Sequence, residues 1–487
     1  MSSWRVRIKS PRFPFEDSCR EKKIESESAH ADMAHRDELK SFLKKAASRS
    51  ESDLKKLGCH TAGKLGKDEQ SVAQLRAARK SRVDDLAFSQ ATLRIVDGML
   101  RWSLDEEIDS FNLPGAKTTM RAGMRRGLET SGEVVDSFKL EELKPNQITS
   151  FLTGVDDFLT PNKGLFRVDK ETLKIGGSFT ANKAQRFLLL IHGTFSNAEN
   201  MVNGFINESG KAFLKSAANH YDEFLAFGHP TLSVSPMLNA LDLARFLRGC
   251  DADIDIVCHS RGGLVARWWA ECFDEIPSRN RKIVFVGSPL AGTSLAAPDR
   301  IKDVIDVMSN IATAIGTTAG AGATLVPFAT PLLTACKAMM RLVSLLSSTV
   351  SKTPLIDAGM SLVPGLAGQS AVGNNEELIR LREFVIDAPR LQQYFFVSSN
   401  FETEAIGWQF WKALRKPLLR LADAGTNQLF KGPNDLVVDT NSMTSLSQKL
   451  TIEKSRIKDF GKNDQVHHLN YFDFPETNKF VADSLLK

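Results

Sequence analysis

The residues best suited to chemistry lie in residues 254–269, IDIVCHSRGGLVARWW. A short apolar run typical of a β-strand leads into Cys258-His259-Ser260-Arg261-Gly262, and an apolar pattern with helical spacing follows at once. This pattern predicts a strand, a tight turn and a helix, with Ser260 at the apex. Such a turn lifts a serine hydroxyl clear of the sheet and exposes the N–H groups that follow it. It also places the positive end of the helix beneath a developing oxyanion.

A simpler reading of this turn is that Ser260 only caps a helix, because Ser is a common N-cap residue. The usual pattern for a nucleophilic serine is G-x-S-x-G, and here Cys258 takes the place of the first Gly. Cys is small enough to let strand and helix approach each other. Because the strand before the turn and the helix behind it are the context that the motif requires, we favour a nucleophile.

A serine hydroxyl needs an imidazole to take its proton, and that imidazole needs a carboxylate to fix its tautomer. In α/β-hydrolases these residues occur in the order Ser, acid, His. The sequence offers Ser260, then Asp435 or Asp439, then His467 or His468, in this order. Asp439 is also suited to forming a turn, and either histidine could be a hydrogen-bonded neighbour of the other.

The rest of the chain from residue 186 alternates between strands and helices. The apolar run at 188–191 ends in His192-Gly193-Thr194, and further strands are predicted at 223–232, 282–286 and 392–399. This rhythm indicates a doubly wound, mostly parallel sheet over residues 186–487. Such sheets bind ligands at the carboxyl ends of their strands, where His192-Gly193-Thr194 and Ser260 both fall.

An insertion of about residues 297–385 interrupts this rhythm. Within it, residues 307–336 carry no charge and are rich in Ala, Gly and Thr. Their length alone would permit a membrane span. Two prolines and the position inside an α/β core favour a helical cap over the site. An apolar cap would indicate an apolar substrate, or a lid that opens at an interface.

Residues 1–150 match none of these signals. We expect a loose arm over 1–35 and a mainly helical N-terminal module over 36–150, with helical patterns at 37–57 and 68–104 and a strand at 132–140. Residues 151–185 read as a linker with a β-hairpin at 164–177. The module could pack on the hydrolase core or hold a partner.

Composition sets the broad class. The 487 residues are 42% hydrophobic and 25% charged, which is typical of a globular protein with a large core. The six cysteines show no metal-like or disulfide-like spacing, and no secretory leader is evident at the N-terminus. We therefore expect a cytoplasmic protein with no metal and no cofactor.

The net charge of +5 comes from the N-terminal region, where residues 1–90 hold 20 Lys and Arg against 14 Asp and Glu. A basic excess of this kind is most often a solvated face, and without a nucleic-acid-binding signature we expect no nucleic-acid partner. The basic module could instead bind a protein partner or an anionic membrane surface, and in the second case the protein would be peripheral to a membrane.

From residue 186 onward the sequence resembles α/β-hydrolases of the bacterial triacylglycerol lipase and GPI-inositol-deacylase-like group. The resemblance rests on His192-Gly193-Thr194, on the turn around Ser260, on the 287–293 run, on Asn434-Asp435-Leu436-Val437-Val438 and on His468-Leu469-Asn470. It implies Ser260 as nucleophile, Asp435 as acid and His468 as base. It further implies that the backbone N–H groups of Thr194 and Arg261 form the oxyanion hole. Leu436 departs from the pattern, because these lipases have Gly after the acid.

Together these features predict a serine hydrolase that cleaves carboxylic esters through an acyl-enzyme, with lipid esters as the substrates that the resemblance and the apolar insertion favour. Peptidases, thioesterases and acyltransferases use the same three residues, and the fold hosts many chemistries. A different class of function is an interaction or membrane-associated protein in which the hydrolase core is inert or secondary and residues 1–150 bind the partner.

Overall fold

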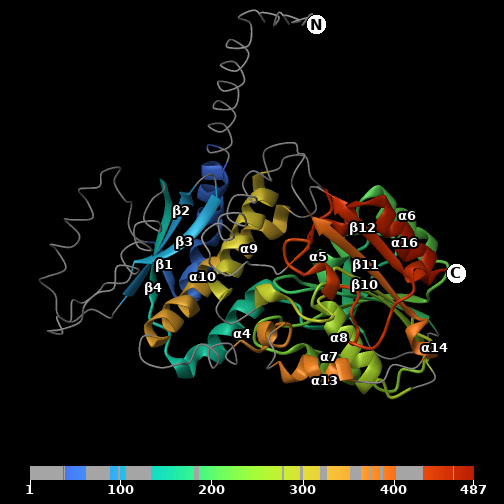
Figure 1. The fold of residues 1–487 in the computed structure, drawn as a ribbon. Helices are drawn as coiled ribbons and strands as arrows, with labels where there is room; N and C mark the ends of the chain where they lie inside the picture. Colours follow the sequence, from blue (N-terminus) through green and yellow to red (C-terminus); the bar gives the residue numbers. More distant parts are fainter. Residues whose placement is uncertain are drawn as a thin grey trace, which may run out of the picture.

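A computed structural model gives the fold of the chain (Figure 1). The residues that it describes are 37, 39–61, 88–96, 99–105, 133–179, 186–276, 279–296, 300–317, 326–350, 363–371, 375–383, 388–401, 432–463 and 465–487. The loose arm predicted for residues 1–35 and the helical pattern predicted for 68–87 lie outside these residues.

The larger sheet has eight strands in the order β12-β11-β10-β9-β7-β8-β5-β6. The strands are β5 (Gly164–Val168), β6 (Ile175–Ser178), β7 (Arg186–Ile191), β8 (Glu223–Gly228), β9 (Asp253–His259), β10 (Ile283–Val286), β11 (Tyr394–Phe401) and β12 (Ile457–Asn463). Neighbouring strands in the run β12-β11-β10-β9-β7-β8 pair in parallel, whereas β5 pairs antiparallel with both β8 and β6. The predicted doubly wound, mostly parallel sheet is confirmed. The predicted hairpin is also present, but its strand β5 extends this sheet, so the α/β domain begins before residue 186.

Helices cover both faces of this sheet. Along β7, Phe187, Leu189 and Ile191 face one core while Leu188 and Leu190 face the other, because successive side chains in a strand point to opposite faces. The helices α7 (Pro236–Phe246), α8 (Gly262–Trp268) and α13 (Glu376–Glu383) pack into the first core. The helices α5 (Ala198–Asn203), α6 (Glu208–Ala217) and α16 (Pro475–Leu485) pack into the second. Burial on both faces explains why β7 reads as a continuous apolar run.

The N-terminal region contains a second, antiparallel sheet, so the prediction of a mainly helical module is wrong. Its strands are β1 (Cys59–Thr61), β2 (Phe88–Val96), β3 (Met99–Asp105) and β4 (Glu133–Glu141), in the order β1-β4-β2-β3. On β2, Ala91, Leu93 and Ile95 are buried at every second position, a strand period that we took for part of a helical stripe. The helix predicted at 37–57 is confirmed over 39–56, and the strand predicted at 132–140 is confirmed as β4.

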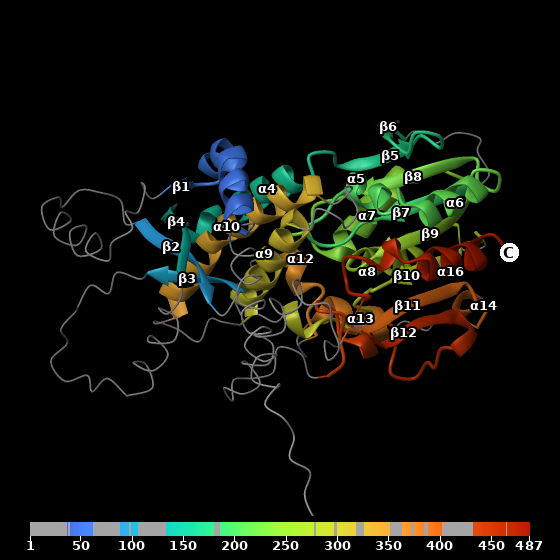
Figure 2. The ribbon, with the colours of Figure 1, turned by 90° about the horizontal axis from the view of Figure 1, so that it is seen from above.

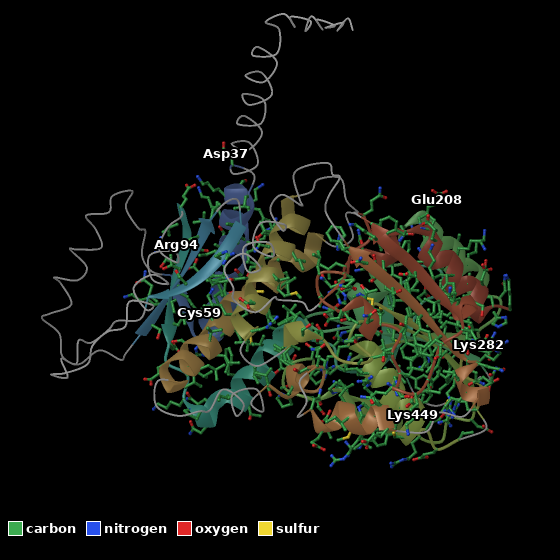
Figure 3. The ribbon with its side chains drawn as sticks, in the orientation of Figure 1. Asp37, Cys59, Arg94, Glu208, Lys282 and Lys449 are labelled. Carbon is green, nitrogen blue, oxygen red and sulfur yellow. The ribbon has the colours of Figure 1, made fainter. Side chains whose placement is uncertain are left out.

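The insertion forms helices that pack against this second sheet. The helices α9 (Ile301–Thr317) and α10 (Val326–Val350) share one hydrophobic core with the N-terminal sheet, the helix at 39–56 and α4 (Ile148–Leu159). Figures 1 and 2 show both helices between the N-terminal strands and the larger sheet. In Figure 3, the labelled Cys59 and Arg94 belong to this N-terminal part. We call this assembly of α9, α10, α4 and the described N-terminal residues the cap.

The helix α10 is the one described helix apolar and long enough to cross a membrane, by length and composition, over Ala329–Leu346. Of this stretch, 72% is buried inside the protein. It carries Lys337, which is 1% exposed and whose Nζ donates to Asp136 Oδ2 on β4 at 2.8 Å. Arg341, one turn on, donates to the carbonyl oxygens of Glu141 and Leu57. Because both charged side chains bond to other residues of the cap, α10 has the contacts of a core helix.

Candidate active site

Ser260 stands at the turn between β9, which ends at His259, and α8, which begins at Gly262. Its φ of +55° lies in the left-handed region, which costs free energy for a residue with a Cβ and is typical of functional sites. The turn closes only because its neighbours are small: a Cβ on Gly262 would lie 2.6 Å from the carbonyl oxygen of Ile191. Cys258 is fully buried beneath the turn, so a small thiol is accommodated where the usual motif has Gly.

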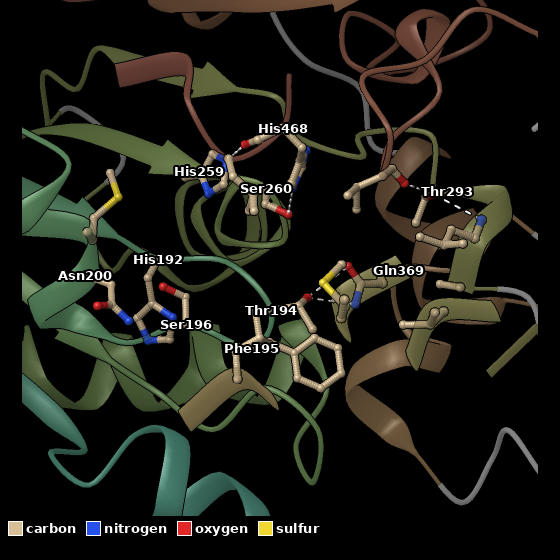
Figure 4. Close-up of a pocket in the computed structure, with 18 of the residues that line it drawn as sticks. His192, Thr194, Phe195, Ser196, Asn200, His259, Ser260, Thr293, Gln369 and His468 are labelled. Carbon is tan, nitrogen blue, oxygen red and sulfur yellow. Dashed lines mark hydrogen bonds between the residues drawn. The ribbon is translucent and has the colours of Figure 1, made fainter. Parts of the chain in front are cut away.

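Ser260, His468 and Asp435 form a continuous hydrogen-bonded chain. His468 Nδ1 donates to Asp435 Oδ2 at 2.9 Å, so Nε2 accepts from the Ser260 hydroxyl, also at 2.9 Å. All three side chains are buried, with exposures of 4%, 3% and 0% for Ser260, His468 and Asp435. Figure 4 shows Ser260 and His468 side by side, joined by this hydrogen bond. An imidazole in this tautomer is arranged to take a proton from the hydroxyl.

The carboxylate of Asp435 is held by three further donors. Its Oδ1 accepts from the backbone N–H groups of Val437 and Val438, at 3.1 and 2.8 Å, and its Oδ2 accepts from the hydroxyl of Tyr471 at 2.9 Å. Burial raises the pKa of Tyr471, which keeps this hydroxyl a donor. Leu436 follows the acid at the position where the lipase pattern has Gly, and its φ is +86°, so the backbone conformation that favours Gly is present with Leu in its place.

The two rival candidates are engaged elsewhere. Asp439 Oδ2 accepts from the N–H and the hydroxyl of Ser294, at 3.0 and 2.6 Å, and so fixes the loop after β10. His467 lies edge-on to Phe401, and burial lowers the pKa of His467 to about 3. The structure therefore brings Ser260, Asp435 and His468 together, and neither Asp439 nor His467 bonds to Ser260.

His259, next to the serine, supports the base rather than the nucleophile. Its Nε2 donates to the backbone oxygen of His468 at 2.8 Å, and the N–H of His468 donates to the backbone oxygen of Asp435 at 3.0 Å. Burial lowers the pKa of His259 to about 3, which keeps its ring neutral. The segment that carries His468 is thus fixed from both sides.

The loop after β7 touches Ser260 directly, since a Cβ on Gly193 would lie 2.6 Å from the Cβ of the serine. His192 Nδ1 donates to the carbonyl oxygen of Gly193 at 2.9 Å, and His192 Nε2 accepts from His229 Nδ1 at 2.8 Å. Carbonyl and N–H of one trans peptide point in opposite directions, so fixing Gly193 O also fixes the N–H of Thr194. Burial lowers the pKa of His192 to about 3, which keeps this buried pair of rings uncharged.

Arg261 follows the serine at the start of α8, where the first N–H groups of a helix have no partner within the helix. Its side chain is fully buried and donates to the backbone oxygens of Val234, at 2.5 Å, and Gly365, at 3.3 Å. Burial lowers the pKa of this guanidinium to about 10, while Asp156 and Glu377 nearby act in the opposite direction. The predicted donors Thr194 and Arg261 thus both flank Ser260.

The insertion adds a residue that the sequence did not reveal. Gln369 follows the short helix α12 (Pro364–Ala367), is 5% exposed, and donates through Nε2 to Thr194 Oγ1 at 2.9 Å. In Figure 4 the two side chains meet below Ser260. Gln369 comes from a segment without any recognisable motif, and only its place in the fold identifies it.

A pocket opens over Ser260 and His468. Its apolar wall comes largely from the insertion and the loops beside it: Leu295, Ala296, Val304, Met308, Leu332, Leu366, Val437 and Leu469. Opposite lie Ser196, Asn200, Met201 and Gly204 on and before α5, with Phe472 and Asp473. Residues 307–336 were predicted to cover the site, and Met308 and Leu332 from this stretch do line the pocket.

Within the described part of the chain, no group of three or more His, Cys, Asp or Glu side chains lies close enough to hold a metal ion. The arrangement around Ser260 has the parts that nucleophilic acyl transfer requires: a hydroxyl bonded to an oriented imidazole, and backbone N–H groups in the adjoining residues.

The sheet order, the turn between β9 and α8 and the chain order of Ser260, Asp435 and His468 define the class of α/β-hydrolases. The chain belongs to the family described as Domain of unknown function (DUF7379), whose model matches residues 165–486. A search among curated proteins gives no match.

Solved structures with a similar fold include two bacterial lipases and a metagenomic carboxyl esterase. The mature lipase of Bacillus licheniformis is 16% identical over 66% of this chain and 99% of its own, with a TM-score of 0.35. Lipase 1 of Pelosinus fermentans is 14% identical over 62% of this chain and 98% of its own, with a TM-score of 0.37. A metagenomic carboxyl esterase is 15% identical over 70% of this chain and 88% of its own, with a TM-score of 0.31.

Proposed function

We propose that this protein is a serine hydrolase that cleaves carboxylic esters, with lipid esters as its substrates. The observation that carries the proposal is the buried chain from Ser260 through His468 to Asp435, with both hydrogen bonds at 2.9 Å. Buried polar groups with this connectivity activate a serine that is otherwise a poor nucleophile at neutral pH.

In the first half-reaction, Ser260 Oγ attacks the carbonyl carbon of the ester while His468 Nε2 takes the hydroxyl proton. The negative charge that develops on the carbonyl oxygen is stabilised by the N–H groups of Thr194 and Arg261. When the tetrahedral intermediate collapses, the ester C–O bond breaks and His468 returns the proton to the leaving alcohol. Water, deprotonated by His468, then attacks the acyl-enzyme, and the acid is released as the hydroxyl of Ser260 re-forms.

An apolar acyl group fits the cap side of the pocket. Val304 and Met308 on α9 and Leu332 on α10 are buried and point their side chains into its wall. Each CH₂ group that moves from water into such a wall contributes about 0.8 kcal/mol. This wall supports a lipid ester as substrate, in preference to a short, polar acyl group.

The proposal is tested by labelling with a fluorophosphonate, which reacts with activated serines, and by mass spectrometry of the modified peptide. We expect modification of Ser260 in the wild type and none in Ser260→Ala, with Ser216→Ala, an exposed serine on α6, labelled as the wild type is. A folded protein that is not labelled at Ser260 would refute the proposal. Rates on matched acyl esters, acyl thioesters and peptides then separate esterase from thioesterase and peptidase.

A further inference from the structure

The pocket has a second end, away from the apolar wall of the cap. His468 must hand its proton to the leaving alcohol, so that alcohol lies beside His468 and the residues that follow it. These residues include Phe472 and Asp473, which line the pocket together with Asn200 on α5. We call Asn200 and Asp473 the polar end of the pocket.

The two parts of the polar end are packed together. Asn200 lies in α5, and Gly204 is the residue that caps the end of this helix. Because the two are four residues apart, they lie on the same side of the helix. A Cβ on Gly204 would lie 3.4 Å from the ring of Phe472, the residue before Asp473. Asn207 further ties the two segments, since its Nδ2 donates to the backbone oxygen of Phe472 at 2.8 Å. This places a side-chain amide and a carboxylate at the same end of the pocket.

The amide of Asn200 has a free donor. Its Nδ2 is shielded from solvent and has no hydrogen-bond partner among the described residues, although such groups are nearly always paired when buried. Figure 4 shows Asn200 beside His192 and Ser196 at the edge of the pocket. A substrate oxygen at this position would supply the missing acceptor.

Asp473 supplies the complementary group. It is an exposed residue that lines the pocket. Whether protonated or not, a carboxyl group accepts a hydrogen bond from a hydroxyl. Among the described residues that line the pocket, none is Lys or Arg, so none of these residues balances the charge of a phosphate.

We propose that Asn200 and Asp473 bind the leaving alcohol of the ester, and that this alcohol is neutral and bears free hydroxyl groups, as in a glycerol ester. A hydroxyl group both accepts and donates, so one diol satisfies the amide donor and the carboxylate acceptor together. This inference rests on the proposed function, since it assigns the half of the substrate that the acyl-enzyme releases.

The test compares four hexanoate esters: those of glycerol, p-nitrophenol, choline and glycerol 3-phosphate. For each, kcat/KM is measured in the full-length wild type, in the pocket variants Asn200→Ala and Asp473→Ala, and in the control Glu476→Gln, an exposed acid three residues beyond Asp473. Asp473→Asn, which keeps an acceptor oxygen but loses the charge, is measured on the choline and glycerol esters. We expect the wild type to prefer the glycerol ester to the phosphate ester. We expect the ratio of kcat/KM for the glycerol ester to that for the nitrophenyl ester to fall about tenfold in each pocket variant and to stay at the wild-type value in the control.

The outcomes separate this inference from the proposed function. If the nitrophenyl ester is cleaved only when Ser260 is present, but neither pocket variant changes the ratio, the polar end does not bind the alcohol and the inference is wrong while the function stands. If the choline ester is preferred and Asp473→Asn removes that preference, the end recognises a cation and the diol assignment is wrong. If no ester is cleaved and Ser260 is not labelled, the proposed function itself fails.

Discussion

Asn310 on α9 bonds to both backbone groups of Leu100 on β3: its Oδ1 accepts from the Leu100 N–H at 2.9 Å, and its Nδ2 donates to the Leu100 oxygen at 2.8 Å. A side-chain amide thus takes the place of a neighbouring strand at the edge of the N-terminal sheet. Trp102 continues the contact, with its N–H on Asp306 and its Nε1 on Ser309. The same helix lines the substrate pocket with Val304 and Met308, so the N-terminal sheet fixes one wall of the pocket.

Replacing Asn310 with Leu should destabilise the cap, because it leaves two backbone groups of Leu100 buried without partners. We expect a loss of about 3 kcal/mol in the free energy of unfolding, measured by denaturant titration. The control is Asn219→Ala, which changes an exposed asparagine after α6 and should leave stability within about 0.5 kcal/mol of the wild type. A loss in Asn310→Leu no larger than in the control would contradict this role of Asn310.

Enlarging Met308 should shorten the acyl group that the enzyme accepts. Met308 is 8% exposed and lies in the apolar wall, so Met308→Trp fills space that a long chain would use. We expect the ratio of kcat/KM for octanoate to that for butyrate esters to fall at least about tenfold, by analogy with small changes in apolar pockets. Equal losses on both chain lengths would mean that Met308 supports the fold and does not contact the acyl group.

The buried pair of His229 and His192 should affect kcat by positioning the Thr194 N–H that stabilises the oxyanion. In His229→Phe the ring keeps its packing on Phe227, but His192 Nε2 loses the side-chain donor at 2.8 Å and keeps only the backbone N–H of residue 229, at 3.2 Å, so the Gly193 peptide is less firmly held. We expect kcat to fall about tenfold with KM nearly unchanged, since the interaction matters most in the transition state. The control His220→Gln changes a histidine at the other end of β8, and an equal kcat loss there would argue against this mechanism.

The assignment of Asp435 as the acid can be tested against Asp439, which lies four residues further on. Asp435→Asn should lower kcat by about 10⁴-fold, because an amide at this position no longer holds His468 in the required tautomer. Asp439→Asn should keep most of its activity, because this carboxylate bonds to Ser294 and not to His468. Single-turnover kinetics on both variants tests the assignment, and a larger loss in Asp439→Asn would reverse it.

Stability should fall as the solution becomes acidic. Burial lowers the pKa of His192, His259 and His467 to about 3 in the folded protein, whereas in the unfolded chain a histidine titrates near 6.5. Below about pH 6.5 the unfolded chain binds more protons than the folded one, so the stabilisation present above that pH is lost progressively toward pH 3. Each such group contributes up to about 1.4 kcal/mol per pH unit in this window.

Denaturant titrations between pH 7.5 and 5 measure this loss. His467→Phe should show a shallower pH dependence than the wild type, because one buried imidazole no longer takes up a proton on unfolding. The same slope in both proteins would mean that other groups cause the acid sensitivity.

Much of the site could be read from the sequence because its chemistry is local. The turn around Ser260 needs a strand, two small residues and a helix in succession, and that order is visible in the chain. The order of serine, acid and histidine left two candidate acids, Asp435 and Asp439, and two candidate bases, His467 and His468. The residue types alone left both members of each pair open, since Asp439 and His467 have the same chemistry as Asp435 and His468. The resemblance to lipases favoured Asp435 and His468, and these are the two residues that the hydrogen bonds connect to Ser260.

The contributions of Gln369, Asn200 and Tyr471 could not be read in this way. Each is an ordinary polar residue that gains its role from a chain segment folded against another far away in sequence, such as Gln369 against Thr194, 175 residues apart. The strands β2 and β3 were missed for a different reason. Their apolar residues fit a helical stripe and a strand alternation about equally well, and their pairing with one another and with α9 decides between the two.

The cap combines the N-terminal strands with helices α9 and α10, which the ribosome synthesises much later. Leu100 and Asn310 are separated by 210 residues, so at ~5–20 residues per second the strand leaves the ribosome roughly 10–40 s before its partner helix exists. For that interval the apolar face that α9 and α10 later cover has only the nearby N-terminal residues to pack against. The nascent N-terminal sheet therefore exposes apolar surface for that interval, which is the condition under which incomplete chains aggregate.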